Sequence, residues 1–175
     1  MLNRLLRPNP IREVGRALYA AVVEQSRTPA LYADLGAPDT TEGRFEVYTL
    51  HVVLLLDRLN HGGERAKAVS QALFDTYVKG LDDALREMGV GDLSVGKKMR
   101  KLGAAFFGRV KSYHTAFSAL PDEGPMRDLV TRTVYADADP AWAPALVDYA
   151  VAQRADIAAQ PIEELLAGRI TWRRP

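Results

Sequence analysis

The sequence contains no cysteine among its 175 residues. The chain therefore has no disulfides, no thiolate ligands for zinc or iron–sulfur clusters, and no cysteine nucleophile. Its longest run of Val and Leu, residues 52–56, is far shorter than the roughly 20 apolar residues of a membrane span. No charge dominates, because 23 Lys and Arg stand against 22 Asp and Glu. A uniformly basic DNA-binding protein is excluded, and any charge-driven binding must use a local patch.

The length and composition are those of one globular domain. A chain of this length can bury about 70% of the surface that its unfolded form exposes. Hydrophobic residues make up 47% of the sequence, which is typical of a globular rather than a disordered protein. We expect one domain over residues 1–175, with a basic lead-in at 1–10 and a tail at 169–175. The lead-in lacks the apolar core of a signal peptide, which favours a cytoplasmic location.

Apolar residues recur at spacings of three and four along most of the chain, which is the period of an amphipathic helix. Proline and glycine clusters separate these segments. The predicted helices cover about residues 10–27, 30–35, 45–60, 64–88, 94–120, 126–135, 142–159 and 161–167. Ser94 is the expected N-cap of the fifth helix. No segment alternates as a strand would, so the sequence predicts an all-α single-domain bundle of about seven or eight helices.

The three histidines form no metal or catalytic motif. His51, His61 and His114 lie 10 and 53 residues apart, whereas two-histidine metal motifs on helices use spacings of three or four. Neither a nucleophile motif nor a phosphate-binding glycine loop is present. His51 lies in the apolar stripe of helix 45–60, which favours a histidine that hydrogen-bonds a neighbour in the core or a groove. We expect no enzyme, no catalytic residue, no cofactor and no metal.

The most informative feature is a local excess of positive charge between residues 94 and 121. This segment contains six basic residues and no acidic one. They are Lys97, Lys98, Arg100, Lys101, Arg109 and Lys111. Two interpretations are open. The cations could pair with the acidic helix that precedes them, or they could form a face for an anionic partner such as phospholipid headgroups, RNA or an acidic protein.

Two consecutive aromatic residues, Phe106 and Phe107, lie in the same segment. Adjacent helical residues point about 100° apart, so both rings cannot face one narrow core stripe. Either the helix is buried on two sides, or one ring lines an apolar groove or exposed patch that receives a partner. We take both rings, together with the six cations, as candidate partner-binding residues.

Four groups of motifs occur in a characteristic order. They are APDT at 37–40 with TLHVV at 49–53, LREMGVGD at 85–92, AFFGRVKSY at 105–113, and LVDYA at 146–150 with IEELLAGRITWR at 162–173. Together they resemble the ubiquinol–cytochrome c chaperone family, the assembly factors for cytochrome b of the respiratory bc1 complex. The resemblance covers roughly residues 31–174. His51, Asp57, Arg58 and Trp172, in or beside these motifs, are candidate groove or structural residues.

The resemblance implies a helical, non-enzymatic chaperone that binds newly made cytochrome b and promotes assembly of the bc1 complex. It implies a compact bacterial form, cytoplasmic and peripheral on the inner face of the bacterial inner membrane. Its further partners would be an anionic membrane surface and, as in mitochondria, the ribosome or a partner subunit. Two other classes stay open: a helical protein that binds haem or another small molecule, and a membrane-surface or RNA-associated regulator that acts through the basic helix 94–120.

Overall fold

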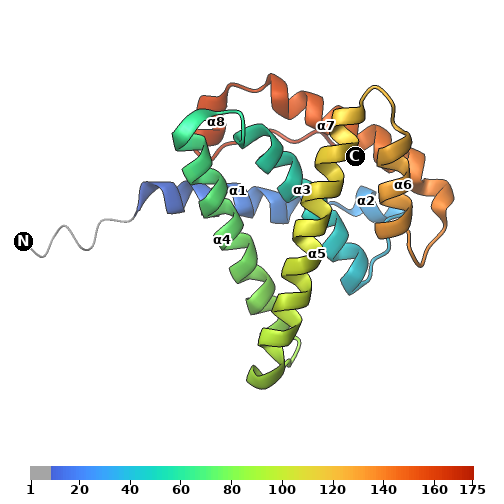
Figure 1. Cartoon of the computed structure of the whole chain (residues 1–175), viewed down its shortest axis with the longest axis horizontal. Helices are drawn as coiled ribbons and strands as arrows, with labels where there is room; N and C mark the ends of the chain where they lie inside the picture. The colour runs from blue at the N-terminus through green and yellow to red at the C-terminus, as the bar shows by residue number, and fades with distance from the viewer. Residues whose placement is uncertain (1–8) are drawn as a thin grey trace, which may run out of the picture.

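The computed structural model describes residues 9–175, in which eight α-helices and one 3₁₀-helix pack around a central helix (Figure 1). The helices are α1 (Pro10–Ser26), α2 (Pro29–Ala33), α3 (Thr41–Leu59), α4 (Gly63–Glu87), α5 (Asp92–Ala119), α6 (Gly124–Thr133), η2 (Pro140–Trp142), α7 (Ala143–Ala159) and α8 (Ile162–Leu166). No strand occurs between residues 9 and 175, so the predicted all-α class is confirmed. Of the predicted lead-in, residues 1–8 lie outside the described part.

Helix α3 is the centre of the bundle and contacts α1, α4, α5 and α7. Each residue from Leu50 to Leu55 is at most 4% exposed, so α3 is buried on nearly every side. A helix that is apolar all round requires such an environment, because any solvated face would expose aliphatic side chains. The Val and Leu run noted in the sequence is therefore the middle of the core helix.

Helices α4 and α5 form a long antiparallel hairpin whose far end projects from the bundle (Figure 1). They contain 25 and 28 residues and are joined by a tight turn at residues 88–91. Apolar residues from Val95 to Phe117 form the inner face of α5, with Phe106 and Tyr113 in the core. Near the projecting end there are fewer neighbouring helices, so more of each side chain reaches solvent.

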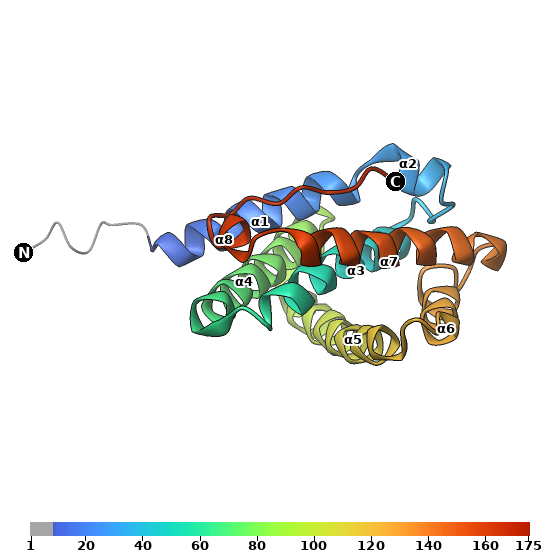
Figure 2. The same ribbon diagram turned by 90° about the horizontal axis from the view of Figure 1, so that it is seen from above.

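After α8, residues 167–175 run back along α1 and α7 (Figure 2). Three glutamine side chains fix this tail. Gln160 bonds both the N–H and the carbonyl of Thr171 at 2.8 Å. Gln25 of α1 donates to the Arg173 carbonyl at 2.9 Å, and Gln153 of α7 accepts from the Arg173 N–H at 3.0 Å. The tail is therefore bound to two helices through hydrogen bonds to its own backbone. Substitution of its exposed side chains would leave these bonds in place.

Three helix starts differ from the prediction by two residues or more, those of α3, α5 and α6, and α6 begins at Gly124 rather than at residue 126. Helix α3 begins at Thr41, four residues earlier than predicted, because the Thr40 hydroxyl accepts a hydrogen bond from the Gly43 N–H at 3.1 Å and caps the first turn. Helix α5 begins at Asp92, so Ser94 lies inside the first turn and its assignment as the N-cap is wrong. Gly91 takes that position and contributes no side-chain hydrogen bond.

Candidate functional site

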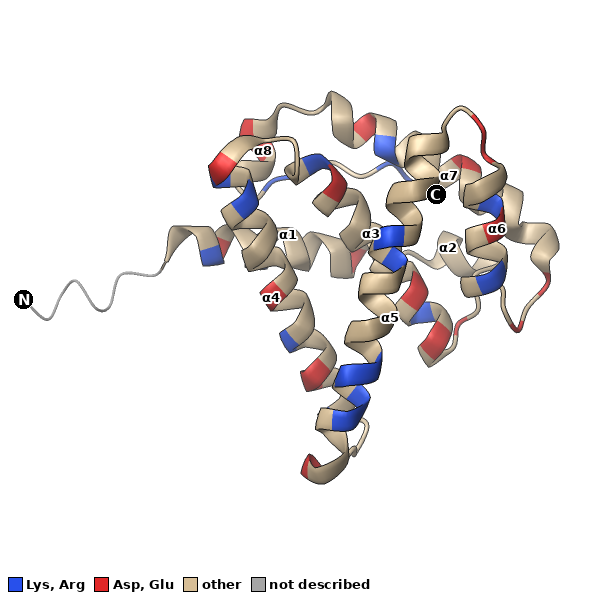
Figure 3. Ribbon diagram, in the orientation of Figure 1, with Lys and Arg blue, Asp and Glu red and all other residues tan. Residues whose placement is uncertain are grey.

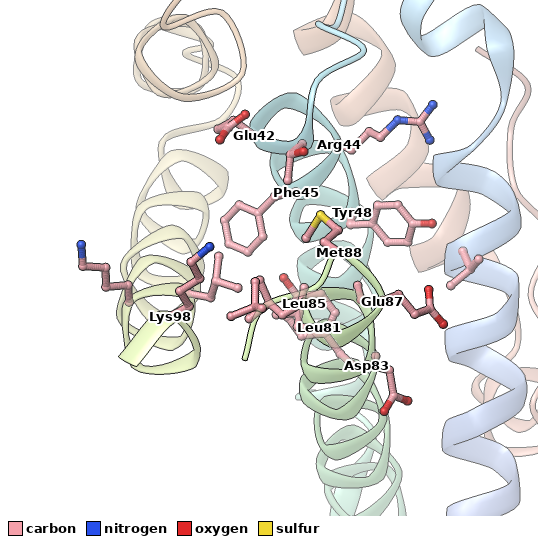
Figure 4. A pocket seen from close by; sticks show the side chains of 18 of the residues that line it. Glu42, Arg44, Phe45, Tyr48, Leu81, Asp83, Leu85, Glu87, Met88 and Lys98 are labelled. Atoms are coloured by element: carbon pink, nitrogen blue, oxygen red, sulfur yellow. The ribbon is translucent and has the colours of Figure 1, made fainter. Parts of the chain in front are cut away.

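A groove lies where the projecting hairpin meets the N-terminal half of α3. Its volume is about 770 Å³, and side chains from α1, α3, α4 and α5 line it. Phe45 points from α3 toward α5, Tyr48 points toward α1, and Met88 of α4 lies in front of them (Figure 4). The groove is thus formed by four helices that are distant in sequence.

The groove combines an apolar floor with a charged rim. The floor residues are Phe45, Tyr48, Leu81, Leu85 and Leu102, and Met88 adds an apolar side chain at the mouth. The charged lining residues are Arg27, Glu42, Arg44, Asp83, Glu87, Lys98 and Lys101. A concave surface of this kind suits the apolar side chains of a partner segment whose flanks are polar.

The spacing of apolar residues in the sequence explains which side chains line the groove on the α4 side. Leu81, Leu85 and Met88 lie at i, i+4 and i+7, which places them on one face of the helix. Leu85 is 7% exposed and Met88 is 54% exposed, because the end of α4 extends past the helices that cover its earlier turns. Helical spacing alone places Met88 on the same face as the buried Leu85, but the structure exposes it at the mouth of the groove.

The basic residues of α5 are blue in Figure 3, and their contacts and exposure separate the six into three sets. Arg109 is tied to the core, since its Nε and Nη2 donate to the two Glu46 carboxylate oxygens at 2.8 and 2.7 Å. Lys98 and Lys101 line the groove. The remaining cations, on the side of α5 away from the groove, are Lys97, Arg100 and Lys111, and all three are exposed.

The acidic residues of α4 do not neutralise these cations. Asp82 of α4 and Asp92 at the start of α5 both accept from Arg86, and Asp83 accepts from Lys79, so these three carboxylates have other partners. Within residues 9–175 the α5 cations other than Arg109 form no ion pair. Pairing of the α5 cations with the preceding acidic helix is therefore not observed within residues 9–175: Arg109 pairs with Glu46 of α3, and the ion pair between α4 and α5 joins Arg86 to Asp92.

Phe106 and Phe107 have different environments. Phe106 is 2% exposed and packs against Phe74 and Tyr77 of α4, with ring centroids 5.4 and 4.9 Å apart. Phe107 is 60% exposed and keeps only one side of its ring against Phe74. This corrects the expectation that both rings bind a partner, because Phe106 could reach one only by leaving the core.

His51 lies at the centre of a buried polar network. Its Nδ1 is 2.8 Å from the Val47 carbonyl, which can only accept, so Nδ1 carries the proton. Its Nε2 then accepts from the Tyr149 hydroxyl at 2.8 Å, and that hydroxyl accepts from Gln25 at 2.8 Å. Complete burial lowers the pKa of His51 to about 4, although the Val47 carbonyl opposes that shift. Both ring nitrogens are occupied, as expected for a core histidine, and neither is free for a haem iron.

The other candidate groove or structural residues lie away from the groove, and their contacts are structural. Asp57 accepts from Arg154 of α7 at 2.8 Å, and Arg58 donates to the Gln160 carbonyl at 3.1 Å. Trp172, in the tail, packs edge-on against the His51 ring with centroids 5.3 Å apart. These residues hold α3, α7 and the tail together.

Several residues of the groove and the network were not identified as such from the sequence. Phe45 and Tyr48 appeared only as members of an apolar stripe, because periodicity does not distinguish a core face from a groove floor. The side chains that complete the His51 network, Gln25 and Tyr149, lie 26 residues before it and 98 after it in the sequence (51 − 25 and 149 − 51). No local signal could have connected them.

The described residues were compared with the requirements of a membrane-spanning helix and of a metal site. Among residues 9–175, no helix combines the length and the apolar character needed to cross a membrane. In the same range, no group of three or more His, Asp or Glu side chains is arranged to hold a metal ion.

Comparison with known proteins gives a consistent result. The family model described as ubiquinol-cytochrome C chaperone matches residues 33–172. A crystal structure of the Cbp3 homolog from Brucella abortus is similar over 99% of this chain and 97% of that protein, with 31% identity and a TM-score of 0.85. No curated protein matches the chain. The family match extends from α2 through the groove and hairpin to Trp172, and the chain belongs to the ubiquinol-cytochrome C chaperone family.

Proposed function

We propose that this chain is a non-enzymatic assembly factor of the cytochrome bc1 complex that binds newly made cytochrome b through the groove. Membership of the chaperone family supports the assembly role. The apolar floor of the groove is the observation that carries client binding, since a hydrophobic membrane protein offers the side chains that such a floor would cover. Peripheral binding on the cytoplasmic face of the inner membrane would place the chain where such a client emerges.

The size of the groove limits what it can hold. A volume of about 770 Å³ is within the range of sites that enclose a compact ligand of several side chains. It is too small for a whole membrane span of about 20 residues. The occupant is therefore a short apolar segment of the client, one or two helical turns long. A partner subunit and the ribosome stay predictions from the family resemblance.

The charged rim fits a client segment whose apolar part is flanked by charged residues. Lys98 and Lys101 lie on the α5 side of the groove, and Asp83 and Glu87 lie along α4. Membrane proteins carry their charged residues at the ends of apolar segments and in the loops that follow. The apolar part of a client segment would occupy the floor, while its flanking charges would meet the rim.

The test is recovery of cytochrome b with the tagged chain from membranes solubilised in mild detergent. We expect the variant Leu81→Glu with Met88→Glu to lower recovery about a hundredfold, because each apolar side chain buried on binding contributes about 1.5 kcal/mol or more. The matched control is Ala158→Glu with Ala159→Glu, which makes the same charge change at two exposed positions of α7 outside the groove.

Retention of cytochrome b by the control and its loss from the groove variant is the expected pattern. Equal recovery with both variants, each shown to be folded by its melting temperature, would contradict the groove as the client site. Absence of cytochrome b from the unmodified chain's eluate would contradict the proposed function itself.

A further inference from the structure

One face of α5 points away from both the core and the groove. Its residues are spaced alternately by four and three, so they stay on one side of the helix. They are Leu93, Lys97, Arg100, Ala104, Phe107 and Lys111, and all are exposed. We call this set the outer face of α5. It shares no residue with the lining of the groove.

Two large apolar side chains of the outer face are in solvent. Leu93 is 101% exposed and Phe107 is 60% exposed, the two largest values among the exposed large hydrophobic residues of the described chain. They are 14 residues apart (107 − 93), which corresponds to about 21 Å along the helix. Both side chains would lose contact with water if α5 lay lengthwise on an apolar layer.

Three cations lie on the same face, and none is neutralised within residues 9–175. Lys97, Arg100 and Lys111 form no ion pair there. The outer face contains no Asp or Glu, and the nearest carboxylate in sequence, Asp92, is held by Arg86. This combination of free positive charge with exposed Leu and Phe is complementary to an anionic surface that has an apolar layer beneath it.

We infer that the outer face of α5 attaches the chain to an anionic lipid bilayer, with Leu93 and Phe107 inserted among the lipids and the three cations at the phosphate groups. A nucleic acid would satisfy the cations but would leave Leu93 without an apolar environment. The attachment goes beyond client binding and uses other residues. The groove would therefore stay free to hold a client segment while the helix lies on the membrane.

The test is sedimentation of the purified full chain with vesicles of phosphatidylcholine, with and without phosphatidylglycerol. We expect binding to require phosphatidylglycerol and to weaken with salt. Lys97→Gln with Arg100→Gln should lower partitioning roughly thirtyfold, because each cation near an anionic surface contributes about a factor of five. The matched control, Lys98→Gln with Lys101→Gln, removes the same charge from the groove side and should lower partitioning less than about threefold.

The apolar contribution is tested separately. Leu93→Gln with Phe107→Gln should lower partitioning at least about tenfold at constant charge. The variant Phe107→Trp should show a blue shift of its emission on adding anionic vesicles.

Equal partitioning of the two charge variants would overturn the assignment to the outer face. Unchanged partitioning of the Leu93 and Phe107 variant, or equally salt-sensitive binding to RNA that this variant leaves unaltered, would overturn the bilayer as the partner. Vesicle binding without cytochrome b recovery, or the reverse, separates this inference from the client proposal.

Discussion

The bundle around α3 and the projecting half of the α4–α5 hairpin differ in how far their charged and large apolar side chains are used by packing within the fold. In the bundle, His51 uses both ring nitrogens, and Glu46 is held by two hydrogen bonds from Arg109. In the projecting hairpin, the α5 lysines form no ion pair within the described residues, and Leu93 is fully exposed. Packing within the fold therefore accounts for His51 and Glu46, but not for the unpaired α5 lysines and the exposed Leu93.

The space around the glycines also differs between the bundle and α5. A Cβ added at Gly15, in α1, would lie 2.7 Å from the backbone of Ala72 in α4, so the two helices approach as closely as they can. A Cβ added at Gly103 or Gly108, in α5, would meet nothing within 4 Å. The bundle is close-packed, whereas one side of α5 is open to a partner.

Truncating one leucine in each region should give the largest difference in the free energy of unfolding between the two regions. Leu55 is 0% exposed in α3, and Leu93 is 101% exposed in α5. We expect Leu55→Ala to lower the free energy of unfolding by about 4 kcal/mol, through lost burial and the cavity left behind. Leu93→Ala should change it by less than about 0.5 kcal/mol. Urea denaturation measures both, and similar losses for the two variants would contradict the division into regions.

The buried histidine predicts a dependence of stability on pH. The pKa of His51 is about 4 in the folded chain and close to 6.5 when unfolded. The unfolded state therefore binds more protons between these values, and the contribution of His51 is complete above pH 6.5 and lost as the pH falls toward 4. We expect a loss of about 3 kcal/mol over this interval.

The matching control is His51→Gln, which removes the titrating ring. Its stability should fall less between pH 6.5 and 4 than that of the unmodified chain, as followed by urea denaturation at each pH. An identical pH dependence in the two proteins would show that His51 does not titrate in this way.

Removing the ion pair that joins α5 to α3 should cause a smaller loss of stability. Arg109→Gln would leave the Glu46 carboxylate, whose side chain is 8% exposed, without its two hydrogen bonds. We expect a loss of about 2 kcal/mol in unfolding free energy. Arg100→Gln, one of the free cations on the same helix, should be nearly neutral. The comparison fails if Arg100→Gln is as destabilising as Arg109→Gln.

The sequence was sufficient to predict the helices, because their apolar spacing is regular and proline and glycine clusters separate them. The inner face of α5 and the burial of His51 followed from the same pattern. The motifs also identified the family, which the match over residues 33–172 confirms.

The groove could not be predicted, since it depends on where one helix ends relative to its neighbours. Met88 continues the apolar series of α4 but is exposed, because α4 extends past the helices that cover its earlier turns. Likewise, the sequence places six cations on α5 but does not show that Glu46, 63 residues away, binds one of them. Such pairings arise only from the three-dimensional arrangement of the helices.

If the groove holds a segment of cytochrome b, the outer face of α5 should not contact that client. The most direct measurement is photo-crosslinking in membranes that are making cytochrome b, with a photoreactive phenylalanine derivative placed at Met88 or at Phe107. We predict a cytochrome b adduct from position 88 and none from position 107. Adducts of equal yield from both positions, or from position 107 alone, would contradict the claim.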